Sequence, residues 1–280
     1  MTKTKVKILA IANQKGGTGK TTVSVNLAAG LAKRNFKTLL IDLDPQHSTT
    51  LSLGIDSTGL STSIYEVLLG EITLEDALTE TFVSNLTLVP AKVDLSNVEI
   101  NLVNEARYQF RLKENLNPIA RQYDYILIDC PPSLSLLTIN ALVASNNVII
   151  PILCDYLSLE GLKQLIASIE RVQKGLNPSL KILGILPNMV DFRCNITKES
   201  LNLVRNHFKG LVFKNLIRTC VKVKEAPSFS KSIFDCRFWS KPATHSGAKL
   251  PSVLEQTCHP FWLKVHHFLG KYQNDQEHSL

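Results

Sequence analysis

A glycine-rich loop between an apolar strand and a helix constrains this chain more than any other feature. The loop reads NQKGGTGKTT from Asn13 to Thr22 and follows the apolar run KVKILAIA at 5–12. The stretch from Lys20 to Lys33 then has the apolar spacing of a helix. A strand, a glycine-rich turn and a helix in this order aim consecutive backbone N–H groups at an anion, which predicts a phosphate-binding loop.

The loop matches most of the standard phosphate-loop pattern GxxxxGK[ST]. Its end is supplied by Gly19, Lys20 and Thr21, whereas Gln14 stands where the first glycine is expected. We expect Lys20 to reach the β- and γ-phosphates of a nucleotide and the Thr21 hydroxyl to bind Mg²⁺. The loop also holds a second cation, Lys15, that the standard pattern does not explain.

Short apolar runs alternate with helical patterns along most of the chain. Further strands are predicted at 37–44, 123–129, 146–153, 180–186 and 211–217, and further helices at 158–174 and 197–209. Residues 55–120 are less regular, with a capping box predicted at Ser63 and Glu66. Near-continuous apolar strands separated by helices predict an α/β fold: a doubly wound, mostly parallel sheet with helices on both faces.

Carboxylates stand at the ends of two predicted strands. LIDLDPQ at 40–46 carries Asp42 and Asp44, and YILIDCPPS at 125–133 carries Asp129. Because Asp42 and Asp44 alternate along a strand, we expect them on the same face. Ligands of such sheets bind beside the carboxyl ends of the strands, so all three are candidates for the phosphate-binding edge.

The composition is that of an ordinary soluble protein, but its charge is uneven. Net charge is +7, and the segment from Val190 to Lys241 holds eleven Lys/Arg against four Asp/Glu, which accounts for all of it. Such confinement is compatible with a polyanion-binding face and with simple solubility. The six cysteines are scattered singly, so neither a zinc site nor a disulfide framework is indicated, and we expect a reduced, cytosolic protein without a membrane span or a signal peptide.

The stretch KGGTGKTT resembles the deviant Walker A motif of the ParA/MinD family of ATPases, and Lys15 matches the signature lysine of that family. The resemblance implies a P-loop ATPase that forms a face-to-face homodimer around two ATP molecules. In such a dimer the signature lysine of each subunit contacts the phosphates in the other's site. A preorganised cation there stabilises charge on the transferring γ-phosphoryl group.

The resemblance extends through further motifs and implies roles for their residues. Asp44 in DxDPQ would position the attacking water, Asp42 would lie in the Mg²⁺ surroundings, and Asp129 would hold Mg²⁺ through water. Cys130 fills a variable position and is expected to be a small buried residue. The implied nucleotide contacts are Gly16, Gly17, Thr18, Gly19, Lys20, Thr21, Thr22, Asn188 in ILPNMVD and Pro227 in EAPS; the implied metal contacts are Thr21, Asp42 and Asp129.

Within the family the chain is more similar to the small chromosome- and plasmid-partitioning ParA proteins. PQHSTT after Asp44 is close to their PQ-x-x-x-T, and the early position of the loop leaves no room for an N-terminal helix-turn-helix. This implies nonspecific DNA binding on the nucleoid and slow ATP hydrolysis stimulated by a ParB-like partner. Arg193 matches one DNA-binding arginine of the family. Arg218 is displaced by one position from the family's second DNA-binding arginine, for which Lys222 is a candidate substitute. A MinD-like positioning ATPase on a membrane is the alternative.

The chain divides into a predicted P-loop ATPase domain at 1–235 and a divergent C-terminal tail at 236–280. The tail departs from the family pattern, since SGAK at 246–249 lacks the expected tyrosine. Pro260 to Gly270 has the spacing of a helix with one apolar face. A packing helix, an altered C-terminus and a membrane-surface helix all remain open.

Overall fold

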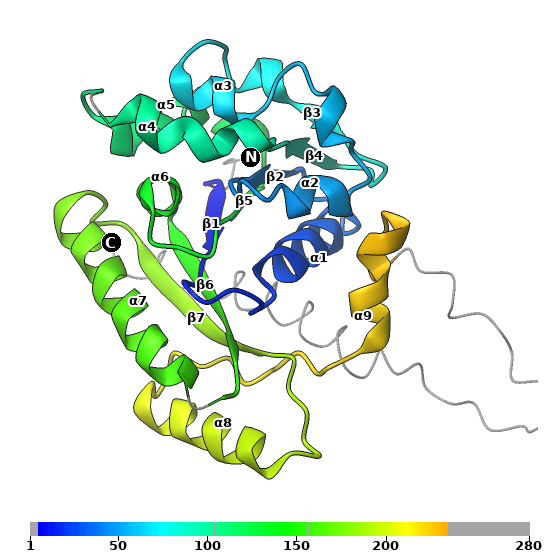
Figure 1. The fold of residues 1–280 in the computed structure, drawn as a ribbon, viewed down its shortest axis with the longest axis vertical. Coiled ribbons are helices and arrows are strands. Elements are labelled where there is room, and N and C mark those ends of the chain that lie inside the picture. Colours follow the sequence, from blue (N-terminus) through cyan, green and yellow to red (C-terminus); the bar gives the residue numbers. More distant parts are fainter. Residues whose placement is uncertain (1–4, 104, 156, 235–280) are drawn as a thin grey trace, which may run out of the picture.

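A seven-stranded sheet forms the centre of the computed structural model, which describes residues 5–103, 105–155 and 157–234 (Figure 1). The strand order is β3-β4-β2-β5-β1-β6-β7, and every neighbouring pair is parallel except β3 with β4. The strands are β1 (Lys7–Ile11), β2 (Thr38–Asp42), β3 (Thr79–Glu80), β4 (Leu86–Val89), β5 (Tyr125–Asp129), β6 (Asn147–Leu153) and β7 (Lys181–Asn188). The predicted doubly wound fold is confirmed.

Helices cover both faces of the sheet. They are α1 (Lys20–Ala32), α2 (Ser48–Ser52), α3 (Ile64–Leu69), α4 (Val98–Leu102), α5 (Arg111–Leu116), α6 (Leu136–Ala144), α7 (Leu157–Gly175), α8 (Asn195–His207) and α9 (Val221–Glu225). The sheet is buried on both faces because alternate strand residues enter two separate cores. Leu9 and Ile11 pack with α1, whereas Ala10 packs in the core that includes α6 and α7 (Figure 1).

The predicted strand at 211–217 is wrong. This segment makes only two isolated bridges to the neighbourhood of β7, Ile185 with Val212 and Val190 with Arg218. The bridged positions are six positions apart along this segment and five positions apart along the β7 side. The register therefore shifts by one residue between the two bridges, and the segment does not join the sheet as a further strand.

The C-terminal tail at 236–280, including the predicted segment Pro260–Gly270, lies outside the described residues. In the ranges that are described, no helix is both long and apolar enough to cross a membrane.

The capping box predicted at the start of α3 is confirmed. The Ser63 hydroxyl accepts from the Tyr65 backbone, and the Glu66 carboxylate accepts from the Ser63 N–H at 2.9 Å. Glu66 also forms an ion pair with Lys92, which precedes the turn that leads to α4. The box therefore fixes both the start of α3 and the segment that follows β4.

A Glu66→Gln variant should lower the free energy of unfolding by about 1–3 kcal/mol at neutral pH. Partial burial raises the pKa of Glu66, but hydrogen bonds from Lys92 and Ser63 outweigh it, so the net pKa is below its usual value. The stabilisation is therefore present above the ordinary glutamate pKa and is lost as the pH falls through the lower folded value. Urea unfolding at pH 7 and pH 3 measures both effects, with the exposed Glu71→Gln as the control; equal losses at the two pH values would contradict the assignment.

Candidate active site

The glycine-rich loop follows β1 and is shaped by two residues in the left-handed region. Gly17 has φ of 73° and Gly19, immediately before α1, has φ of 83°. Asn188, the last residue of β7, donates from its side-chain nitrogen to the Thr18 carbonyl at 2.8 Å. Gly19 lies so close to this amide that an added Cβ would stand 2.2 Å from the Asn188 nitrogen. The loop is therefore packed against β7 as well as β1.

A Gly19→Ala variant is expected to lose at least about tenfold in nucleotide affinity, since alanine is disfavoured at positive φ and its methyl group would displace Asn188. The loop would then change shape where its N–H groups must point at phosphate. Titration with a fluorescent ATP analogue measures the loss. Gly59→Ala is the matched control, because an added Cβ there meets nothing within 4 Å. Wild-type affinity in Gly19→Ala would contradict this geometry.

Asn13 ties the start of the loop to the neighbouring strand. Its side-chain nitrogen donates to the Pro151 carbonyl in β6 at 2.6 Å, and its oxygen accepts from the Lys15 N–H at 3.0 Å. Sequence reasoning did not single out Asn13. Its position between an apolar strand and the first glycines was the available signal, but the partner in β6 is 138 residues away.

The two loop lysines lie in different environments. Lys20, in the first turn of α1, is buried, and its ammonium donates to the Lys15 carbonyl at 3.3 Å. Burial lowers the pKa of Lys20, and the negative charges of Asp129 and Asp44 oppose this effect. Lys15 is partly exposed and forms an ion pair with Asp155 at 2.7 Å. Lys20 thus points into the loop, whereas Lys15 is bound at its rim.

Asp129 ends β5 inside a group of hydroxyls. Its two oxygens accept from Thr21 at 2.8 Å, Ser24 at 2.9 Å and Thr49 at 2.7 Å. Burial raises the pKa of Asp129 to about 6, although the hydroxyls lower it in part. An adjacent carboxylate and threonine hydroxyl fit Mg²⁺, which prefers oxygen ligands and takes few of them from the protein when phosphates are present. The segments described contain no cluster of three or more His, Cys, Asp or Glu side chains suited to a metal held by protein alone.

Asp42 and Asp44 differ more than the sequence predicts. Strand β2 ends at Asp42, so Asp44 lies in the following turn and not on the same strand face. Asp42 is fully buried and accepts from the Thr50 N–H at 2.8 Å, the Thr50 hydroxyl at 2.7 Å and the Asp44 N–H at 3.2 Å. Burial and then repulsion by Asp129, its register neighbour in β5, raise the pKa of Asp42 to about 7.

The remaining residues that are predicted to contact the nucleotide lie in the loop, at the start of α1, at the end of β7 and in the turn after α9. Thr18 is buried in the loop, and Thr22 lies in the first turn of α1. Asn188 is buried with its amide on the loop, and Pro227 lies in the 3-10 turn Ala226–Phe229, which packs beside α2. Contact of Asn188 and Pro227 with adenine stays a prediction. Cys130 is fully buried, as predicted, and burial raises the pKa of its thiol.

Comparison with known proteins identifies the family. A family model described as an AAA domain matches residues 6–182. The chromosome partitioning protein ParA of Myxococcus xanthus is 48% identical over 227 residues, which cover 81% of this chain and 80% of that protein. The chain belongs to the ParA/Soj family of chromosome-partitioning ATPases. The sporulation initiation inhibitor protein Soj of Bacillus subtilis is 46% identical over 81% of this chain and 90% of its own.

One solved structure is similar to this chain in both fold and sequence. The crystal structure of cobyrinic acid a,c-diamide synthase from Mycobacterium smegmatis with a bound ATP analogue and magnesium has a TM-score of 0.74 and 37% identity. It covers 80% of this chain and 93% of its own. The similarity in fold supports the P-loop assignment for this ParA/Soj-family chain.

The basic residues that are predicted to bind DNA lie on two segments, one just before α8 and the other leading into α9. Arg193 is exposed and its guanidinium forks onto Asp191, with the shortest contact at 2.6 Å. Hydrogen bonds from Arg193, with the added charge of Arg218, lower the pKa of Asp191 to about 2. Arg218 stands over the Phe192 ring at 5.2 Å. Arg193 and Arg218 are therefore brought together, while Lys222 lies at the start of α9 and pairs with Glu225.

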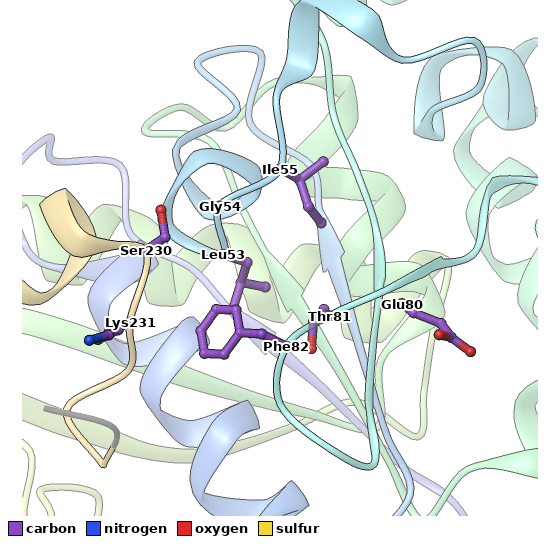
Figure 2. A pocket seen from close by; sticks show the side chains of 8 residues that line it. All are labelled: Leu53, Gly54, Ile55, Glu80, Thr81, Phe82, Ser230 and Lys231. Carbon is purple, nitrogen blue, oxygen red and sulfur yellow. The ribbon is translucent and has the colours of Figure 1, made fainter. Parts of the chain in front are cut away.

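A pocket of about 550 Å³ lies elsewhere, between the end of α2, strand β3 and the turn after α9. Figure 2 shows its lining: Leu53, Gly54, Ile55, Glu80, Thr81, Phe82, Ser230 and Lys231. None of the predicted site residues lines it. The candidate active site is thus defined by its polar contacts and not by this hollow.

Proposed function

We propose that this protein binds Mg–ATP, forms an ATP-dependent homodimer, binds DNA without sequence preference and hydrolyses ATP slowly until a ParB-like partner stimulates it. It would act in chromosome or plasmid partitioning from the cytoplasm, on the nucleoid. The observation that carries this proposal is the presence of two lysines with different environments in one phosphate-binding loop, Lys20 buried within it and Lys15 at its rim.

ATP binding rests on the loop and the start of α1. The loop N–H groups and the N-terminus of α1 would surround the phosphates, and Lys20 would neutralise their charge. Thr21 and Asp129, already joined by a hydrogen bond, would hold Mg²⁺, which supplies charge neutralisation when bound. The ATP analogue and magnesium in the mycobacterial structure support the same cofactors here. Residues 1–235 would form this ATPase domain, with 236–280 as a separate tail.

Hydrolysis requires a water oriented toward the γ-phosphorus. Asp44 is nearly buried, and one of its oxygens accepts from the Gln46 N–H at 2.9 Å, which fixes the carboxylate at the edge of the site. We assign to Asp44 the orientation of the attacking water. Lys15 of a second copy would add positive charge where the γ-phosphoryl group leaves. Asp42, whose oxygens are bound to Thr50 and Asp44, would support this loop from beneath the metal site.

DNA binding rests on charge. The excess of positive charge in this chain is confined to the segment that contains Arg193, Arg218 and Lys222, and Arg193 is exposed. Phosphate contacts depend on cations more than on exact geometry, so a face of this kind binds DNA without reading its sequence.

The test is co-sedimentation with DNA and, separately, with anionic liposomes, each with and without ATP. We expect ATP-dependent binding to DNA whose affinity falls steeply and linearly on a logarithmic scale as salt rises. Arg218→Ala should weaken it and reduce the salt slope by about one, whereas Lys181→Ala, on the edge strand β7, is the control. ATP-dependent binding to liposomes alone would replace the proposal with the MinD-like alternative. Phosphate release with DNA and a ParB-like protein present then tests the stimulated turnover.

A further inference from the structure

The ammonium group of Lys15 is held inside its own chain. Its partner is Asp155, which lies in the short connection between the end of β6 at Leu153 and the start of α7 at Leu157. Asp155 Oδ2 and Lys15 Nζ are 2.7 Å apart. Asp155 comes from none of the motifs that mark the nucleotide site in the sequence.

The backbone of Lys15 is fixed independently of this ion pair. Its N–H donates to Asn13 at 3.0 Å, and its carbonyl accepts from the Thr18 hydroxyl at 3.4 Å and the Lys20 ammonium at 3.3 Å. Asn13 is in turn bonded to β6. Movement of Lys15 toward a second chain therefore needs only a change of side-chain rotamers. Among the described residues, the side-chain contact of its ammonium group that must break is the ion pair with Asp155.

This ion pair has the strength of a releasable contact. The side chains of Lys15 and Asp155 are 39% and 41% exposed. Pairs at such exposure are well solvated and contribute little to stability, and salt weakens them further. A buried ion pair would be costly to break, whereas this exposed pair can be broken when Lys15 finds another partner.

We propose that Asp155 is a positioning residue that holds Lys15 in the monomer and competes with the nucleotide of a second copy for its ammonium group. This inference rests on the proposed ATP-dependent dimer. In the monomer Asp155 neutralises Lys15 and keeps it from the phosphates of its own site. In the dimer the negatively charged phosphates of the partner site replace Asp155. The Lys15–Asp155 ion pair therefore helps to set the concentration of ATP-bound protein at which dimers form.

The effect is doubled by symmetry, because each dimer releases two lysines. Loss of one exposed ion pair changes an equilibrium by about 1.4- to 5-fold, so Asp155→Asn should lower the dimer dissociation constant by about 2- to 25-fold. The difference between wild type and variant should shrink at high salt, since the wild-type pair is then screened.

The experiment is sedimentation equilibrium of the full chain with a non-hydrolysable ATP analogue at low and high salt. Asp155→Asn is compared with wild type and with Glu170→Gln, which removes one exposed charge from the far part of α7 and should change nothing. The same substitution in a Lys15→Ala background should have no effect, because the competing ammonium group is absent. Thermal unfolding checks that each variant is folded. If Asp155→Asn does not fold, Asp155→Ser takes its place in the comparison.

The outcomes separate the two proposals. Tighter dimers at low salt, only when Lys15 is present, support the inference. Unchanged or weaker dimers in Asp155→Asn, or the same gain in the Lys15→Ala background, overturn the role of Asp155. The proposal of an ATP-dependent dimer is not affected by these two outcomes. A wild-type chain that binds the analogue but stays monomeric at all concentrations overturns the ATP-dependent dimer and this inference with it.

Discussion

An Asp44→Ala variant is expected to bind ATP with nearly wild-type affinity and to release phosphate at least about 100-fold more slowly. Lys20, the loop N–H groups and the Thr21–Asp129 pair all remain in this variant, so the groups assigned to nucleotide binding are retained. What is lost is the carboxylate that orients water. Equilibrium binding of a fluorescent ATP analogue and phosphate release with DNA and partner present measure the two effects separately.

Two further variants make the Asp44 result specific. Asp44→Asn keeps an oxygen to accept from the Gln46 N–H and loses only the charge, so it distinguishes a role in catalysis from a role in holding the turn. Asp56→Ala removes an exposed carboxylate at a distant turn and should retain turnover. Phosphate release at the wild-type rate in both Asp44 variants would remove Asp44 from the mechanism.

A Lys15→Ala variant is expected to keep ATP binding through Lys20 and to form dimers still, but to lose hydrolysis by about 1,000-fold or more. Lys20→Ala is the matched comparison in the same loop: it should abolish ATP binding, because Lys20 is the buried cation. Both variants should thus lose turnover, but only Lys20→Ala should also lose ATP binding. Wild-type turnover in Lys15→Ala would refute its role at the subunit interface.

A mixing experiment decides whether Lys15 acts across the dimer. Neither Lys15→Ala nor Asp44→Ala alone has an intact site, but a heterodimer of the two has one site that combines Asp44 of one chain with Lys15 of the other. Because half the dimers in an equal mixture are heterodimers with one such site each, turnover should recover to about one quarter of wild type. If Lys15 acts within its own chain, the mixture stays as inactive as its components.

The sheet was predictable from sequence because its strands are buried on both faces and read as continuous apolar runs. β1, β2, β5, β6 and β7 were all expected within a few residues of their bounds. Strand β4 and helix α6 lie in stretches for which no element was predicted. The segment 211–217 is apolar enough for a strand, but in the folded chain it forms isolated bridges and no ladder.

The candidate site was predictable where motifs carry it and not where distant residues complete it. Lys20, Thr21 and Asp129 are marked by local pattern; the structure joins Thr21 to Asp129 by a hydrogen bond and places the Lys20 ammonium on the Lys15 carbonyl. Thr49, the third hydroxyl on Asp129, and Asp155, the partner of Lys15, belong to no such pattern. Their roles arise from contacts across 80 and 140 residues, which a single sequence does not disclose.

The position of β1 at the centre of the sheet also governs how the chain folds during synthesis. β1 is made before both of its neighbours, β5 and β6, and its first residue Lys7 pairs with Tyr125. Until those strands leave the ribosome, the apolar KILAI segment has no sheet partner, whereas β2 and β4 can already pair. The phosphate-binding loop, anchored through Asn13 to Pro151, thus reaches its final shape only after a strand 138 residues further along the chain has been made.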